Sequence, residues 1–156
     1  MPVIIGQPAP EFALYDSAKN LVKLSELRGK NVLLLFFPLA FTSTCTKELC
    51  SVRDTIAVYN NANAVVFGIS VDSPQTLARF KEDQGLNFTL LSDFNKEASR
   101  AYDTIYEMFG LNMKGVSKRS AFVIDKEGIV RYTEVLENAS EVPDFKNIVK
   151  TLAELG

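Results

Sequence analysis

The chain has 156 residues, of which 47% are hydrophobic, and its formal net charge is −2. This length suits one domain over residues 1–156 with a single core, which needs no disulfide or metal to fold. Seventeen basic residues are scattered among nineteen acidic ones, which argues against nucleic acid as a partner. The chain contains no His, which excludes Ser-His and Cys-His hydrolases and the usual catalytic zinc sites.

The longest apolar run begins at residue 32 and is far shorter than the ~20 residues that span a bilayer. The N-terminus lacks the charged segment and long apolar stretch of a signal peptide. We therefore expect a cytoplasmic protein without a membrane partner. In that compartment, two cysteines favour catalytic or redox chemistry over a permanent disulfide.

The first half of the chain contains a buried strand followed by a long helix. Residues 6–16 are turn-rich, and residues 21–30 predict a short strand and a turn or one-turn helix. The run "NVLLLFFPL" at residues 31–39 is typical of a central strand of a parallel sheet. Apolar residues at steps of three and four predict one helix over 42–62, with Ser/Thr N-cap candidates at its start.

The second half alternates strands and helices. We expect a strand over 64–72, a helix over 73–85, a strand over 88–93, a helix over 96–105, a hairpin over 120–136 and a last helix over 142–156. This order predicts an α/β fold, a mixed central β-sheet flanked by helices on both faces. Ligands bind such sheets beyond the carboxyl ends of the strands, where residues 38–46 are expected to lie.

The two cysteines lie together in "PLAFTSTCTKELC", residues 38–50. A thiolate is the reactive form, and an unperturbed cysteine, with a pKa of about 8.5, is mostly protonated at neutral pH. The first turn of a helix offers Cys45 unpaired amides and the positive end of the helix dipole. Thr42 could add a hydroxyl hydrogen bond, Pro38 ends the strand, and Arg119 is the candidate guanidinium. We expect the sulfur in a shallow, open hollow.

Cys50 follows Cys45 by five residues, which is ~7.5 Å of rise and about 140° of rotation along a helix. A disulfide needs Cα atoms within roughly 7 Å, so the two thiols cannot bond while the helix is intact. Bonding would follow oxidation of Cys45 to a sulfenic acid and unwinding of the first turns. Cys50 also lies beside Leu49 on the apolar stripe, so a purely structural role in the core stays open. Arg119, taken alone, is equally compatible with an ordinary surface residue.

The stretch "FFPLAFTSTCTKELCSVRD" resembles the active site of the peroxiredoxin family, whose pattern Pro-x-x-x-Thr-x-x-Cys falls on Pro38, Thr42 and Cys45. The segments "IGQPAPEFAL", "VFGISVDSP", "FTLLSD" and "RSAFVIDKEGIVRY" extend the resemblance over nearly the whole chain. It implies a thioredoxin-like fold with N-terminal and C-terminal extensions, and reduction of hydrogen peroxide and organic hydroperoxides without a cofactor. Cys45 is then the peroxidatic cysteine, with Pro38, Thr42 and Arg119 around the peroxide.

Two subgroups of the family share features with the chain. A second cysteine five positions on, together with Glu48, is similar to the Q-type or bacterioferritin-comigratory peroxiredoxins. This resemblance implies that Cys50 resolves the sulfenic acid and that Glu48 joins Pro38, Thr42 and Arg119 as a substrate-binding residue. A thioredoxin-like dithiol protein would then reopen the disulfide. The stretches "PLAFT" and "LLSDF" resemble the E-type, which can work with one cysteine. The family includes monomers and homodimers, and either state is compatible with the sequence.

Two other functions remain as alternatives. A thioredoxin-type disulfide reductase is disfavoured because the chain lacks a Cys-x-x-Cys motif. A thiol-based redox sensor, whose helix unwinds to expose a binding surface, would use the same opening. Catalytic turnover of peroxide would distinguish the enzyme from the sensor.

Overall fold

The computed structural model describes residues 2–155, which contain one seven-stranded sheet with the order β2-β1-β5-β4-β3-β6-β7. Its strands are β1 (Ala13–Asp16), β2 (Leu21–Lys23), β3 (Asn31–Phe36), β4 (Ala64–Ser70), β5 (Thr89–Ser92), β6 (Ser120–Ile124) and β7 (Val130–Val135). The helices are α1 (Ser43–Asp54), α2 (Ile56–Asn61), α3 (Pro74–Gln84), α4 (Glu97–Ala101) and α5 (Phe145–Leu155). Two 3-10 turns, η1 (Leu24–Leu27) and η2 (Gly110–Asn112), complete the elements.

The sheet is mixed, as the sequence predicts. Strands β3, β4 and β5 run parallel, whereas β6, β7, β1 and β2 each pair antiparallel with their neighbours. All six residues of β3 are buried, because this central strand is covered on both faces. Leu33 and Leu35 point to one cluster of the core, and Leu34 and Phe36 to the other.

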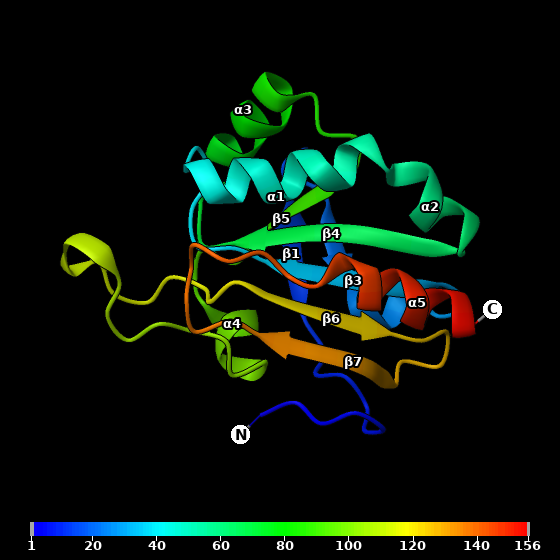
Figure 1. The fold of residues 1–156 in the computed structure, drawn as a ribbon. Coiled ribbons are helices and arrows are strands. Elements are labelled where there is room, and N and C mark those ends of the chain that lie inside the picture. The colour runs from blue at the N-terminus through cyan, green and yellow to red at the C-terminus, as the bar shows by residue number, and fades with distance from the viewer. Residues whose placement is uncertain (1, 156) are drawn as a thin grey trace.

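Helices α1, α2, α3 and α5 cover one face of the sheet, and α4, η1 and the N-terminal segment cover the other (Figure 1). The predicted thioredoxin-like arrangement, with helices on both faces and extensions at the two ends, is therefore confirmed. Among residues 2–155, no helix is both long and apolar enough to cross a bilayer.

Two predicted helices differ from those observed. The single helix expected over 42–62 is divided at Thr55, whose backbone leaves the helical region and whose hydroxyl donates to the Ser51 carbonyl. The helix expected over 96–105 ends at Ala101. Asp103 then takes a φ of 51°. The Thr104 hydroxyl forms hydrogen bonds with the Lys118 carbonyl and the Ser120 hydroxyl, at the start of β6, instead of continuing the helix. Both breaks arise from side-chain hydrogen bonds that compete with the helical ladder.

The hairpin predicted over 120–136 is confirmed. Its turn depends on Gly128, which has a φ of 84° and donates its N–H to the Asp125 carbonyl at 3.0 Å. The Asp125 carboxylate accepts the amides of Glu127 and Ile129 at 2.9 and 3.0 Å. This fixed turn sets the register that begins β6 at Ser120, directly after Arg119.

Candidate active site

The segment between β3 and α1 lies at the carboxyl end of the parallel strands, as predicted. Asp72, which follows β4, holds this segment because its carboxylate Oδ2 accepts the Ala40 amide at 2.8 Å and the Ser70 hydroxyl at 2.6 Å. Phe41, with a φ of 66°, packs its ring against Phe80 of α3 at 5.1 Å between centroids. The start of α1 is therefore fixed by contacts with β4 and α3.

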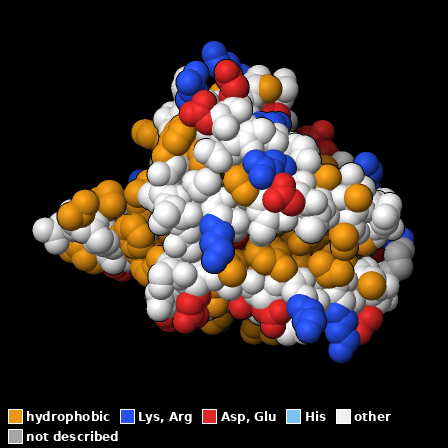
Figure 2. Space-filling model, turned by 45° about the horizontal axis from the view of Figure 1, so that its top comes forward, with side chains coloured by type: hydrophobic (Ala, Val, Ile, Leu, Met, Phe, Trp, Pro, Cys, Tyr) orange, Lys and Arg blue, Asp and Glu red, His pale blue; other side chains and the backbone are white. Residues whose placement is uncertain are grey.

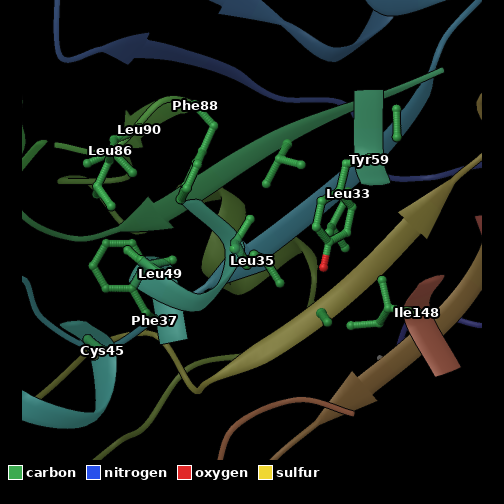
Figure 3. Packing of buried hydrophobic residues seen from close by; sticks show 14 of the residues in the cluster. Leu33, Leu35, Phe37, Cys45, Leu49, Tyr59, Leu86, Phe88, Leu90 and Ile148 are labelled. Carbon is green, nitrogen blue, oxygen red and sulfur yellow. The ribbon is translucent and has the colours of Figure 1, made fainter. Parts of the chain in front are cut away.

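Cys45 is the third residue of α1 and is fully buried. It belongs to the same core cluster as Phe37 and Leu49, and Figure 3 shows it at one end of that cluster. The expectation of a sulfur in a shallow open hollow is therefore wrong. The side chain packs under the helix because Leu49, one turn further on, draws this face of α1 onto the sheet.

A hollow of about 230 Å³ lies beside the start of α1. Its walls come from four parts of the chain and are formed by Pro38, Thr42, Ser43, Thr44, Phe109, Arg119, Ala139 and Ser140. Three of the predicted site residues, Pro38, Thr42 and Arg119, therefore line one cavity. A small ligand in this hollow would lie next to the first turn of α1, where helix geometry leaves backbone amides without an acceptor inside the helix.

Arg119 contacts Cys45, although 74 residues separate the two along the chain. Its Nη2 donates to the Cys45 sulfur at 3.1 Å, and its Nη1 donates to Oε1 of Glu48 at 2.6 Å. Nη2 and Nε also donate to the Ala139 carbonyl at 3.0 and 3.2 Å. The residue is 1% exposed, so four hydrogen bonds hold a buried cation against the thiol.

The charge of Arg119 is maintained by its partners. Burial alone would lower the pKa of this guanidinium, but Glu48 and Cys45 carry the net pKa shift upward. The group therefore stays protonated and cannot act as a base toward the thiol. It can stabilise an anion at the sulfur or on a ligand beside it.

Glu48 lies on α1, one turn beyond Cys45, and is buried. Burial raises the pKa of its carboxyl to about 7, although the Arg119 charge pulls that pKa down. Its second oxygen, Oε2, has no hydrogen-bond partner among residues 2–155. From the sequence, Glu48 was predicted only by the family pattern. In the structure it forms an ion pair with Arg119 and is not among the residues that line the hollow.

Thr42 precedes α1 and differs from the expectation. Its hydroxyl donates to the Leu39 carbonyl at 2.8 Å, so its proton is not directed at the sulfur. It also makes no side-chain cap on the helix. The reason is local: Thr and Ser hydroxyls commonly bond to a backbone carbonyl three residues earlier, and here that carbonyl belongs to Leu39. Thr42 shapes the loop and is one of the residues that line the hollow.

Cys50 is half-buried and lies on the side of α1 that faces α3. Its sulfur donates to Oε1 of Gln84 at 3.5 Å. Both thiols are free, and both lie within the continuous helix Ser43–Asp54. The structure thus brings Cys45, Glu48 and Arg119 together, and it keeps Cys50 apart on another face.

Three residues of this site were missed by sequence reasoning. Asp72 could have been anticipated, since it follows a strand parallel to β3 and must lie beside the loop that starts α1. Ala139 contributes only its carbonyl, so its side chain gives no signal. Phe109 lines the hollow from a loop that has no periodicity.

The segment that carries Phe109 projects from the body of the protein near η2 (Figure 1). Figure 2 shows hydrophobic side chains gathered on this projection. Met108, Leu111 and Met113 are exposed there, Leu111 by 94%. An apolar surface therefore borders one wall of the hollow.

Comparison with known proteins identifies the family. The profile of the AhpC/TSA family matches residues 5–133. Alkyl hydroperoxide reductase E of Mycobacterium tuberculosis is 39% identical over 154 residues, with 97% of each chain covered. Peroxiredoxin Bcp of Bacillus subtilis is 38% identical over 157 residues, with 99% of each covered. The crystal structure of peroxidoxin BcpB from Mycobacterium tuberculosis aligns with a TM-score of 0.86 and 28% identity over 99% of both chains.

These relatives include both subgroups that the sequence resembles, Bcp peroxiredoxin and alkyl hydroperoxide reductase E. The family match spans the segment from Ile5 to Thr133 and so includes both cysteines and Arg119. The chain belongs to the AhpC/TSA family and is a peroxiredoxin, a thiol peroxidase that reduces peroxides through a cysteine.

Proposed function

We propose that Cys45 is the peroxidatic nucleophile and that Arg119 stabilises both its thiolate and the reacting peroxide. The observation that carries this assignment is the 3.1 Å contact between Nη2 of Arg119 and the Cys45 sulfur. The thiolate attacks one oxygen of the peroxide, the O–O bond breaks, and the second oxygen leaves as an alkoxide or hydroxide that takes up a proton. Cys45 becomes a sulfenic acid. Negative charge moves onto the leaving oxygen, where Arg119 and the first amides of α1 are favourable.

The hollow beside α1 is the proposed peroxide site. Pro38, Thr42 and Arg119 line it, and its volume of about 230 Å³ exceeds what hydrogen peroxide needs. Phe109 and the exposed apolar side chains near η2 favour organic hydroperoxides as additional substrates. Hydrogen peroxide and organic hydroperoxides are therefore the proposed substrate class.

We propose that Cys50 resolves the sulfenic acid. Its thiolate attacks the Cys45 sulfur, the S–O bond breaks, hydroxide leaves and takes up a proton to become water, and an intramolecular disulfide forms. Residues 45–50 must unwind first, because both sulfurs lie on one continuous helix. Thr42, Ser43, Thr44 and Thr46 are poor helix formers, and Thr42 provides no side-chain cap, which favours this opening.

The oxidised pair would be reduced by a thioredoxin-like dithiol protein through thiol–disulfide exchange, with the partner's two thiols oxidised in turn. A single-cysteine cycle, in which an external thiol resolves Cys45, is the alternative, and the stretches "PLAFT" and "LLSDF", which resemble the E-type, favour it. A redox-sensor role would require the same opening of α1.

We also infer that residues 1–156 form one domain, since one sheet takes strands from Ala13 to Val135. The cytoplasmic location and the monomeric or homodimeric state stay predictions.

Intact mass after one equivalent of peroxide tests the resolving step. Loss of two hydrogens from the wild-type protein is the expected result, and Cys50→Ser should instead gain one oxygen. Cys50→Ser should also complete one turnover and then stop with a thioredoxin-like reductant. Normal cycling of Cys50→Ser with that reductant, or a wild-type product that has gained one oxygen and kept its hydrogens, would support the single-cysteine cycle.

A further inference from the structure

One guanidinium faces two acidic groups in this site. Nη2 of Arg119 contacts the Cys45 sulfur at 3.1 Å, and Nη1 contacts Oε1 of Glu48 at 2.6 Å. The two acids are three residues apart on α1 and therefore lie on the same face of the helix. Each uses a different nitrogen of the same cation, so the two anions compete for a single positive charge.

Within residues 2–155, Arg119 is the one cation that lowers the pKa of the Glu48 carboxyl, so no second positive charge relieves this competition there. Among residues 2–155, Arg119 is the cation that pairs with Glu48, and Glu134 of β7 adds a further negative charge. Glu134 is itself held by the Tyr132 hydroxyl and the Asp144 amide. If Cys45 and Glu48 were both ionised, two buried anions would share one buried cation, and like charges at short range disfavour such a state.

Glu48 is built to take a proton. It is buried, and its Oε2 lacks a hydrogen-bond donor among the described residues. Among the described residues Oε2 has no acceptor either, but a buried charge without donors costs far more than an unsatisfied neutral hydroxyl, so these surroundings favour the protonated carboxyl. Burial also raises the pKa of this carboxyl to about 7, so the proton is present over part of the working pH range.

We propose that Glu48 is a positioning residue that controls the ionisation of Cys45 through the shared Arg119. When Glu48 holds a proton, the guanidinium charge is left to the sulfur and the thiolate forms. When Glu48 is ionised, it takes that charge and disfavours the thiolate. In this step a proton passes from the thiol of Cys45 to the carboxylate of Glu48, which leaves a thiolate and a carboxylic acid. The pair gains or loses no proton to solvent. The inference rests on the proposed role of Cys45 as the nucleophile.

The test is a pH titration of the Cys45 thiolate by its ultraviolet absorbance, in the Cys50→Ser background so that one thiol reports. Glu48→Gln keeps an oxygen that accepts from Arg119 but removes the competing charge. Its thiolate midpoint is expected to move to lower pH, by about one pH unit or more, as strongly coupled sites do. Asp54→Asn is the matched control, since Asp54 is the exposed carboxylate at the other end of α1. It should leave the midpoint unchanged.

A second measurement follows from reciprocity and needs no Glu48 variant. The carboxyl ¹³C signal of Glu48 is followed by NMR in Cys50→Ser and in the Cys45→Ser/Cys50→Ser double variant. Removing the ionisable sulfur should lower the pH midpoint of Glu48 by the same amount that Glu48→Gln lowers the midpoint of Cys45. This arm applies even if Glu48→Gln does not fold.

An unchanged thiolate midpoint in Glu48→Gln, or a Glu48 signal indifferent to Cys45, would overturn the proposal. A thiolate midpoint that moves to higher pH would do so as well, because it would mean that Glu48 only holds Arg119 in place. Peroxide turnover is measured on the same samples. Coupled titrations without peroxide turnover would reject the proposed function and leave the coupling standing, so the two failures are distinguishable.

Discussion

The guanidinium of Arg119 lies 3.1 Å from the sulfur of Cys45, although 74 residues separate them along the chain. The contact exists because β6 pairs with β3, so the residue that precedes β6 meets the helix that follows β3. Ala139 and Glu48 occupy the other donors of the guanidinium and fix its direction. The reactivity of this site therefore depends on strand pairing as much as on the local motif.

Replacing Arg119 with Lys should lower the second-order rate constant for peroxide by about 10²–10³, the usual cost of one transition-state donor. A lysine keeps the charge but cannot serve the sulfur, Glu48 and the Ala139 carbonyl together. Stopped-flow peroxide reduction measures the effect. Arg131→Lys, at an exposed arginine that pairs with Asp125, is the control. A rate within twofold of wild type in Arg119→Lys would remove Arg119 from the mechanism.

Thr42→Val should reduce the same rate constant by roughly fivefold, because it removes one hydrogen bond of about 1 kcal/mol. The Thr42 hydroxyl donates to the Leu39 carbonyl within the loop, and Thr42 is one of the residues that line the hollow. Thr42→Ser retains the hydroxyl and should stay near the wild-type rate. A loss in Thr42→Ser with none in Thr42→Val would point to the methyl group instead of the hydroxyl, because Val keeps that methyl group.

Glu48 should make the fold less stable as the pH rises. Its folded pKa of about 7 lies above the ordinary value of 4.5, so the folded state binds this proton more tightly than the unfolded state. The contribution is present below pH 4.5 and is lost between that value and pH 7, with a total of up to roughly 3 kcal/mol. Urea unfolding at several pH values tests it. Glu48→Gln should flatten this dependence, and an unchanged slope would contradict the burial argument.

Asp72→Ala should lower the free energy of unfolding by about 2 kcal/mol and weaken peroxide reduction, since the Ala40 amide and the Ser70 hydroxyl lose their acceptor. Urea denaturation and stopped-flow kinetics report the two effects. Asp54→Ala, on an exposed part of α1, is the control. A stable Asp72→Ala protein with full activity would show that the loop before α1 does not need this anchor.

Local patterns predicted the parts of the fold that depend on short-range physics. The apolar run at β3 and the Gly128 turn predicted a buried strand and a hairpin, and both are observed. The break at Thr55, the acceptor of the Thr42 hydroxyl and the burial of Cys45 were not predicted. Each depends on a competing hydrogen bond or a tertiary contact, which residue spacing alone does not encode.

Within the site, the Arg119 contact also depends on tertiary structure that local patterns do not predict. Spacing alone could not place this residue, and the resemblance to the family pointed to it. The position of Cys50 against Gln84 of α3, by contrast, follows from α3 packing beside α1, which the sequence does not specify. Its role in resolution is therefore the part of the proposed cycle that depends most on experiment.

The most direct measurement compares the second-order rate constants of Cys50→Ser and Cys45→Ser with hydrogen peroxide, followed by stopped flow under single-turnover conditions. Cys50→Ser should react at a rate that exceeds that of a free cysteine by several orders of magnitude and should gain one oxygen on Cys45. Cys45→Ser should react no faster than a free cysteine. Rapid peroxide reduction by Cys45→Ser would contradict the assignment of Cys45 as the nucleophile.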